Sequence, residues 1–234
     1  MKLPFFYISQ YDGAQKEIML DEDTSKHVVQ VLRMKVGEQL NLTDGKGNLL
    51  TCEITYDNKR RCTVAIKEKT YKEQNTKSIS IGISLLKNTN RFEWFLEKAT
   101  EIGVSEIIPL LCERTEKEKF RYDRLHGICI SAMLQSQQTW LPLLHQPVEF
   151  TKVIQDSVAA QKYIAYCESE DSKRPLLSQS ATLNSALICI GPEGDFTPIE
   201  IRLALQNKFI PVSLGETRLR TETAGVVAAV ILSQ

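Results

Sequence analysis

The sequence has little of what a membrane protein, a secreted protein or a structural metal site would need. Its longest apolar runs, such as residues 226–232 (VVAAVIL), are far shorter than the roughly 20 residues of a membrane-spanning helix. Polar residues follow the short apolar stretch at the N-terminus, so no signal peptide is expected. The six cysteines form no CxxC pair and only three histidines are present, which argues against a structural zinc site. Buried free thiols, no metal and a cytoplasmic location are therefore expected.

The sequence also lacks an excess of charge of either sign. The 29 Lys and Arg residues balance the 29 Asp and Glu residues, so the formal net charge is +0. This balance argues against a protein that coats nucleic acid by bulk electrostatic attraction, although it permits a local basic patch. Hydrophobic residues make up 42% of the 234 residues, too many for a disordered chain, so one or two folded domains are expected.

The first domain is expected over residues 1–72, where short runs of β-forming residues alternate with turns. The turn sequences are rich in residues that tolerate positive φ. One short helix interrupts the strands at roughly 24–34, with Asp23 or Thr24 as its N-cap. This spacing of strands and turns predicts a small β-barrel. The strand-like runs are residues 5–9, 38–44, 49–57 and 60–71.

The second domain is expected over residues 73–234, where strands alternate with helices. Such alternation predicts an α/β fold with a parallel sheet. A helix is expected at 90–102 with Asn90 as its N-cap, and residues 197–200 have the pattern of a capping box with proline at the first helical position. A parallel sheet of this kind binds ligands at the carboxyl ends of its strands. The expected strands are residues 78–86, 107–111, 162–167, 186–190 and 209–214.

The last helix, about 222–233, is apolar nearly all round, which is typical of a buried helix. Two interpretations remain open at this point. The helix is buried either in its own domain or in a contact between subunits.

Two segments place glycine and polar residues between a strand and a helix. Residues 191–196 (GPEGDF) form a turn that lets backbone amides approach a ligand, or they are simply a tight connection. Residues 214–224 (LGETRLRTETA) gather two arginines, two glutamates and three threonines in and beside one loop. These polar groups are either functional or serve helix capping by Thr221 with pairing of arginine and glutamate.

Taken together, these two segments closely resemble the paired signature of the RsmE family. Other parts of the chain agree with the resemblance along most of its length. They are residues 27–40 with the DGKG turn, 85–110, CERTE at 112–116, and 132–142 with its Gln-Ser…Pro stretch.

The resemblance implies an S-adenosylmethionine-dependent enzyme of the SPOUT class that methylates N3 of a specific uridine in 16S ribosomal RNA of the small subunit. It implies a parallel sheet with a C-terminal trefoil knot, preceded by a PUA-like β-barrel that binds RNA. It also implies a homodimer. Because N3 is on the pairing edge of uracil, the target base must be unpaired or flipped out.

The resemblance also carries over candidate site residues. Arg220 is a candidate for stabilising the uracil anion and Glu222 for accepting the N3 proton, although both could be structural, Glu222 by pairing with an arginine. The cofactor-binding candidates are Cys167, Glu168, Gly191, Pro192, Glu193, Gly194, Leu214, Gly215, Leu219, Arg220, Thr221 and Ala224. The RNA-binding candidates are Lys2, Arg33, Lys35, Lys87, Arg91, Arg114 and Gln135.

The chain departs from the family pattern at a few positions. Asp195 stands where the family usually has a second glycine, and Ser131, Leu134 and Gln138 stand where it commonly has glutamates and an arginine. These departures leave two alternatives open. One is a SPOUT methyltransferase with another RNA target, and the other is an RNA-binding ribosome-assembly protein with a decayed catalytic site.

Overall fold

The computed structural model describes residues 3–116, 119–167, 173–178 and 184–234. Its internal contacts divide the chain into two units. The first consists of Met1–Gln74 with Met133–Leu141, and the second of Asn75–Ala132 with Pro142–Gln234. The sequence-based boundary after residue 72 lies near the end of the main segment of the first unit.

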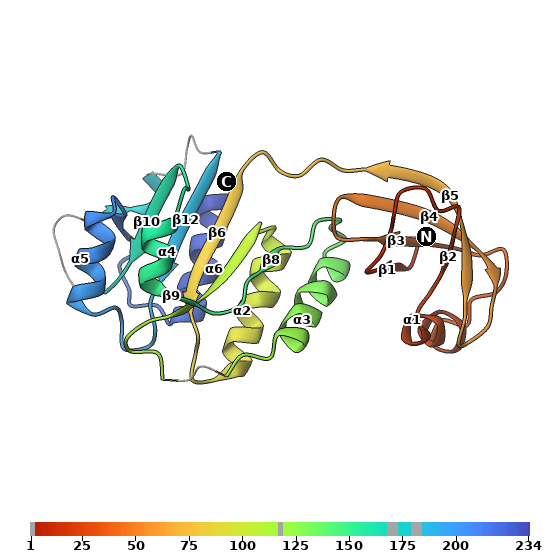
Figure 1. The fold of residues 1–234 in the computed structure, drawn as a ribbon, viewed down its shortest axis with the longest axis horizontal. Coiled ribbons are helices and arrows are strands. Elements are labelled where there is room, and N and C mark those ends of the chain that lie inside the picture. The colour runs from red at the N-terminus through yellow and green to blue at the C-terminus, as the bar shows by residue number, and fades with distance from the viewer. Residues whose placement is uncertain (1–2, 117–118, 168–172, 179–183) are drawn as a thin grey trace. The chain divides into compact units, whose positions relative to one another are not determined.

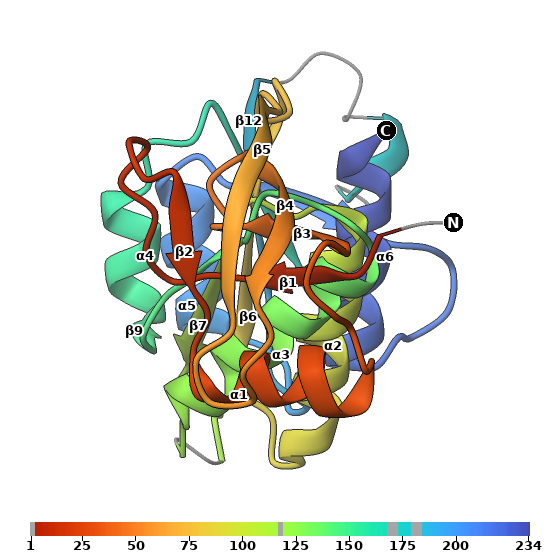
Figure 2. The ribbon, with the colours of Figure 1, turned by 90° about the vertical axis from the view of Figure 1, so that its right-hand side faces the viewer.

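The first unit is a five-stranded sheet in the order β1-β3-β4-β5-β2. All its pairs are antiparallel except β1 with β3. The long pair β4–β5 carries two register shifts, which increase local twist and help the sheet to curl (Figure 2). Alternate residues of β4 (Leu50, Cys52 and Ile54) are fully buried, so one face of the sheet forms the core. The strands are β1 Phe5–Tyr7, β2 Glu17–Met19, β3 Gln39–Thr43, β4 Asn48–Tyr56 and β5 Thr63–Tyr71.

The helical insertion of this unit begins earlier than the sequence predicts. Helix α1 spans Glu22–Lys26 and continues as one π-helical turn, His27–Val31. Its N-cap is Asp21 rather than Asp23 or Thr24, because the Asp21 carboxylate accepts hydrogen bonds from both the backbone N and the Oγ1 of Thr24.

A segment from the middle of the chain packs on the barrel. The backbone N of Gly47 donates to Thr139 O and that of Leu141 donates to Gly45 O, each at 2.9 Å. The indole Nε1 of Trp140 donates to Lys72 O at 2.8 Å. A Cβ at Gly47 would lie 2.7 Å from both the Trp140 ring and Lys72 O, so this turn needs glycine for the close approach as well as for its φ of +91°.

The second unit is built on a parallel sheet in the order β11-β13-β10-β12-β6-β7-β8, and β9 also pairs with β7 (Figure 1). The predicted α/β architecture with a parallel sheet is therefore confirmed, and a separate domain with a curled β-sheet precedes it, as expected. The trefoil knot stays a prediction. The strands are β6 Ser78–Ser84, β7 Glu106–Leu111, β8 Leu143–Leu144, β9 Val148–Glu149, β10 Gln161–Ala165, β11 Arg174–Pro175, β12 Ser185–Ile190 and β13 Ile210–Ser213.

Helices cover both faces of this sheet (Figure 1). Side chains of α4 and α5 share a buried cluster with alternate residues of β7, β10 and β12. On the other face α6 packs on β6, β12 and α2. Because the strands are parallel, the loops that follow β6, β7, β10, β12 and β13 meet at one edge. The helices are α2 Thr89–Ile102, α3 Tyr122–Gln135, α4 Phe150–Asp156, α5 Pro198–Gln206 and α6 Thr221–Ser233, and Leu176–Ser178 form a 3₁₀ turn.

The helix ends test the sequence interpretation directly. The capping box of α5 is present as predicted, with Thr197 as N-cap and Glu200 completing it. Helix α2, however, begins at Thr89 with Asn88 as N-cap, and Asn90 is already helical. Helix α6 begins at Thr221, so Thr221 does not cap it, and Arg220 holds the N-cap position without a side-chain hydrogen bond. No helix in the described part of the chain is long and apolar enough to cross a membrane.

Candidate functional site

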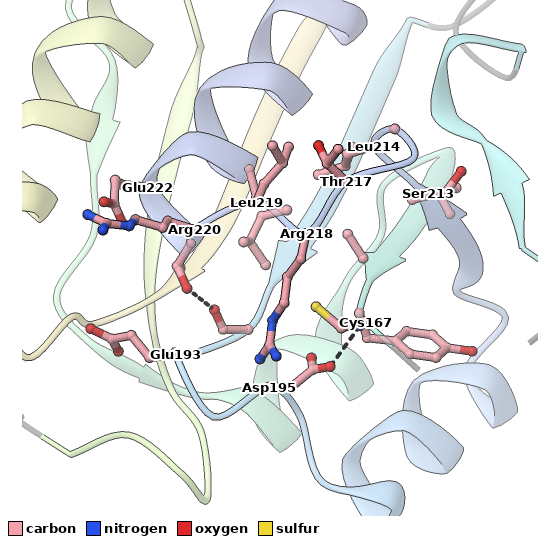
Figure 3. A pocket seen from close by; sticks show the side chains of 18 of the residues that line it. Cys167, Glu193, Asp195, Ser213, Leu214, Thr217, Arg218, Leu219, Arg220 and Glu222 are labelled. Carbon is pink, nitrogen blue, oxygen red and sulfur yellow. Dashed lines mark hydrogen bonds between the residues drawn. The ribbon is translucent and has the colours of Figure 1, made fainter. Parts of the chain in front are cut away.

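A cavity of about 770 Å³ lies at the carboxyl edge of the parallel sheet (Figure 3). Its walls are the ends of β10, β12 and β13, the loops that follow them, and the start of α6. Arg91 of α2 and Lys173 complete the lining. Ligand-binding pockets span roughly 300–1,000 Å³, so this cavity has the size expected for a cofactor-sized molecule.

The cavity gathers nearly all the cofactor-binding candidates that the described residues include. Glu168 lies outside the described residues, and Gly194 is not part of the lining. The candidates that line the cavity are Cys167, Gly191, Pro192, Glu193, Leu214, Gly215, Leu219, Arg220, Thr221 and Ala224.

Gly194 instead faces Arg114. Its carbonyl oxygen accepts a hydrogen bond of 2.6 Å from Arg114 Nη1, and a Cβ built on Gly194 would lie 3.3 Å from Arg114 Cδ. A side chain at this position would therefore meet Arg114 before it reached the cavity. Arg114, a candidate for RNA contact, holds the shape of the 191–196 loop in this structure.

A hydrogen bond joins the two signature loops. Thr221 Oγ1 donates to Gly191 O at 3.0 Å, and both residues are buried. A Cβ at Gly191 would lie 3.1 Å from the Phe196 ring, a tight contact that glycine avoids. The start of α6 and the end of β12 are therefore fixed together on one side of the cavity.

Asp195 joins the 191–196 loop to the end of β10. Its backbone has φ of +62°, a left-handed conformation that glycine, Asn and Asp adopt more readily than other residues. Asp195 Oδ2 accepts from the backbone N of Cys167 at 2.7 Å, and Oδ1 accepts from the backbone N of Phe196 at 2.8 Å (Figure 3). Aspartate in place of the family's usual glycine therefore adds a hydrogen bond that connects the 191–196 loop to the end of β10. The Asp195 side chain was not among the predicted site residues.

Cys167 lines the cavity but is not activated as a nucleophile. Burial and, second, the Asp195 carboxylate raise the pKa of its thiol above the ordinary value of 9.0. The thiol therefore stays protonated at neutral pH, where only a thiolate would be reactive.

A buried carboxylate lies in the part of the cavity away from Asp195 and Cys167 (Figure 3). Glu222 Oε1 lies 3.6 Å from Arg91 Nε, and the Glu222 side chain is only 9% exposed. Its second oxygen, Oε2, is buried without a hydrogen-bond partner among the described residues. Glu222 thus pairs with an arginine, as one interpretation of the sequence anticipated, and its second oxygen keeps an unused acceptor. Arg220 lies beside it at the start of α6 (Figure 3).

The RNA-binding candidates are distributed over both units, and their contact with RNA stays a prediction. Lys87 and Arg91 line a second hollow of about 450 Å³, which shares Arg91 and Glu193 with the cofactor cavity. Lys87 Nζ also pairs with Glu116 at 2.7 Å. In the first unit Arg33, Lys35 and Gln135 are exposed, whereas Lys2 lies outside the described residues. No group of three metal-ligating side chains occurs in the ranges that the structure describes.

Comparisons with known proteins agree with this architecture. Residues 72–233 match the family model of an RNA methyltransferase domain, and residues 20–67 match an RNA methyltransferase PUA domain. Ribosomal RNA small subunit methyltransferase E of Rickettsia conorii is 27% identical over 230 residues, covering 97% of this chain and 94% of the relative.

Two solved structures are similar over nearly the whole chain. A probable rRNA-methyltransferase from Porphyromonas gingivalis has a TM-score of 0.90 at 38% identity, covering 97% of this chain and 95% of that one. Ribosomal RNA small subunit methyltransferase E from Neisseria gonorrhoeae, bound to S-adenosyl methionine, has a TM-score of 0.85 at 27% identity with the same coverage of both chains.

The parallel sheet, the cavity at its edge and the matched domains define an RNA methyltransferase with a PUA domain. Within that class, the chain belongs to the RsmE family.

Proposed function

We propose that this protein methylates N3 of a specific uridine in 16S ribosomal RNA of the small subunit, with S-adenosylmethionine as methyl donor. The observation that carries the proposal is the cavity itself. The two family-signature loops and the end of β10 enclose it, and its lining includes Glu222, a carboxylate with one oxygen that has no hydrogen-bond partner among the described residues.

The residues of the cavity fit S-adenosylmethionine. Gly191 and Gly215 keep the backbone of two loops open to a ligand, and a Cβ at Gly215 would meet nothing within 4 Å, although its φ of +143° favours glycine. Leu214 and Leu219 offer apolar surface, while backbone groups of the loops offer donors and acceptors for a polar ligand. When bound, S-adenosylmethionine supplies a methyl group on a positively charged sulfonium.

The main contribution of the protein is then positioning, since the reaction is an in-line transfer. Uracil N3 carries a proton and is a poor nucleophile until that proton leaves. Glu222 accepts the N3 proton, and the Arg220 guanidinium stabilises the negative charge that spreads to the flanking uracil carbonyls. Arg91 holds one oxygen of Glu222 and so orients the carboxylate.

The partners follow from the same proposal. The PUA-like barrel and the basic residues of both units contact the RNA, and two copies of the chain form a homodimer in the cytoplasm. Helix α6 supports the dimer, because Val230 on its outer face remains 40% exposed although the helix is apolar.

Variants at Glu222 and Arg220 test the chemistry. Glu222→Gln should lower the single-turnover rate of methyl transfer to small subunits from a strain lacking the gene by roughly 10²–10⁴-fold, because an amide cannot take the N3 proton. Arg220→Ala should lower that rate more than it lowers the affinity for S-adenosylmethionine measured by calorimetry. Arg202→Ala, an exposed arginine of α5, is the control and should behave as wild type.

Two results would contradict the proposal. A Glu222→Gln variant with the wild-type rate would remove Glu222 from the chemistry. A wild-type protein that binds small subunits but transfers no methyl group would favour an RNA-binding protein with a decayed site.

A further inference from the structure

Asp195 is an oriented carboxylate in the wall of the cofactor cavity. Its left-handed backbone and its two backbone partners, Cys167 N at 2.7 Å and Phe196 N at 2.8 Å, hold the side chain in place. A carboxylate offers about four acceptor positions, so these two bonds leave acceptor capacity unused. Because Asp195 lines the cavity, that capacity is open to a ligand (Figure 3).

The other carboxylates of the cavity are placed differently. Glu193 Oε1 accepts from the backbone N of Lys87 at 3.3 Å, and Glu222 pairs with Arg91. Glu193 lines the second hollow together with Arg91, the partner of Glu222, whereas Glu216 is exposed in the loop after β13. Asp195 lies instead beside Cys167, at the end of β10, with the Arg218 guanidinium facing it (Figure 3). The cavity therefore has a Glu222 end and an Asp195 end.

We infer that Asp195 accepts hydrogen bonds from the ribose hydroxyls of S-adenosylmethionine and so contributes to cofactor specificity. The methyl group must face the Glu222 end, where the acceptor base is activated. The adenosine then extends toward the other end, where Asp195 is the anchored acceptor for a pair of neighbouring hydroxyl donors. This inference rests on the proposed cofactor and not on the identity of the target nucleotide.

Calorimetry with S-adenosylhomocysteine and its 2′-deoxy and 3′-deoxy analogues tests the inference without any methyl transfer. A hydrogen bond to a charged group corresponds to about a 10- to 100-fold change in affinity, so wild type should bind at least one deoxy analogue that much more weakly. Asp195→Gly keeps the left-handed backbone but removes the carboxylate. It should bind the parent ligand and both analogues with affinities within about 3-fold of one another.

Two further variants separate ligand contact from structure. Lys208→Gly changes a second non-glycine residue of positive φ (+66°), which is exposed and lies just after α5, and it should keep the wild-type discrimination between the three ligands. Asp195→Asn keeps an acceptor oxygen and a side chain that tolerates this backbone, so its discrimination should lie between those of wild type and Asp195→Gly.

Three results would overturn the inference. The first is equal binding of all three ligands by wild type. The second is an Asp195→Gly variant that still distinguishes the parent ligand from the deoxy analogues as wild type does. If Asp195→Gly binds none of the ligands, the third is an Asp195→Asn variant that distinguishes them as fully as wild type does. Absence of S-adenosylhomocysteine binding by wild type would refute the proposed cofactor as well. If Asp195→Gly loses the discrimination between ligands as expected, but the wild-type protein methylates a different nucleotide, only the proposed target is refuted.

Discussion

At the scale of single residues, the contact between α6 and α2 depends on Gly225. A Cβ at this position would lie 2.6 Å from Phe95 Cε2 and 3.0 Å from Ile83 Cδ1, both buried. Helix α6 begins with the residues of the second signature loop, so the packing at Gly225 also sets where Thr221 and Glu222 reach the cavity.

Gly225→Ala should therefore destabilise the protein by about 1–3 kcal/mol, the usual cost of overpacking a core. Denaturant unfolding measures the change. Gly127→Ala, in the interior of α3 where a Cβ would meet nothing within 4 Å, is the matched control and should stabilise by about 0.5–1 kcal/mol through helix propensity alone. Equal effects of the two substitutions would contradict the close packing of α6.

Thr221→Val should lower the free energy of unfolding by about 1–2 kcal/mol and weaken S-adenosylmethionine binding, because it leaves the buried carbonyl of Gly191 without its donor. Thr221→Ser retains the hydroxyl and should restore most of both properties. Calorimetry and denaturant unfolding on the two variants provide the comparison. A valine variant that binds the cofactor as wild type does would show that the link between the two loops is unimportant.

The sequence predicted the cavity at this scale better than it predicted individual roles. Glycine-rich turns after strands can be recognised from local pattern, but the candidate residues came from the family resemblance, and ten of them line one cavity. The roles of Asp195 and Arg114 depend on partners 28 and 80 residues away along the chain, and no local pattern contains them. Aspartate at a position where the family usually has glycine was the one available signal, since Asp is among the residues that tolerate the positive φ usual for glycine.

At the scale of elements, the loop after β7 holds the loop after β12. The backbone N of Glu113 donates to Glu200 Oε1 at 2.9 Å, and Thr197 Oγ1 donates to Glu113 Oε2 at 3.0 Å. Arg114 adds its bond to Gly194 O. The CERTE segment therefore fixes both the N-terminus of α5 and the loop that lines the cavity.

An ion pair between an arginine of α3 and a glutamate of α2 joins the two helices. Its contribution to the free energy of unfolding should depend on pH. Arg124 Nε and Nη2 donate to the two Glu93 oxygens at 2.6 and 2.9 Å, and Arg124 lowers the pKa of Glu93 below its ordinary value of 4.5. A lowered folded-state pKa contributes stability above the unfolded-state pKa, and this contribution is lost as the pH falls through the folded-state pKa.

Glu93→Gln should accordingly lower the unfolding midpoint at pH 7, and the difference from wild type should shrink below about pH 4.5. Denaturant unfolding over pH 3–8 measures it, at conditions where both proteins unfold reversibly. Glu97→Gln, on the same helix and paired with Lys98 at the surface, is the control and should change the unfolding midpoint at pH 7 less than Glu93→Gln does. A Glu93 effect that is constant with pH would contradict the electrostatic account.

The elements themselves were predictable where a single local rule decides them. The α5 capping box requires only Thr197 and Glu200 at the right spacing, and it forms as expected. Asn90 was predicted to cap α2, but the structure uses Asn88, an asparagine two residues earlier. Pairing of β1 with β3 and of β13 with β10 connects distant segments, so periodicity could not predict strand order.

At the scale of the whole molecule, the charge is balanced in each part of the chain. Residues 1–72 carry 12 basic and 10 acidic residues, and residues 73–234 carry 17 and 19. Bulk attraction to phosphates is therefore small, and recognition must depend on a few local contacts.

The protein should consequently bind naked 16S RNA weakly and the assembled small subunit more tightly. Filter binding or surface plasmon resonance at one fixed salt concentration compares the two, since such affinities depend steeply on salt. Equal affinity for both would indicate that the RNA sequence alone is recognised.

Domain organisation also illustrates what sequence cannot supply. The segment Met133–Leu141 lies well inside the second domain by sequence, yet it hydrogen-bonds with the turn at residues 45–47 of the barrel. A trefoil knot is likewise a property of the whole path of the chain, and only the family resemblance suggested it.

The central claim is that this chain methylates uracil N3 at one site in small-subunit RNA. The direct measurement is to incubate purified protein and S-adenosylmethionine with small subunits from a strain lacking the gene, then map the modified nucleotide by mass spectrometry against methyluridine standards. The account predicts a single 3-methyluridine at one position in 16S RNA. A methyl group on another atom or base, or on a different RNA, would contradict it.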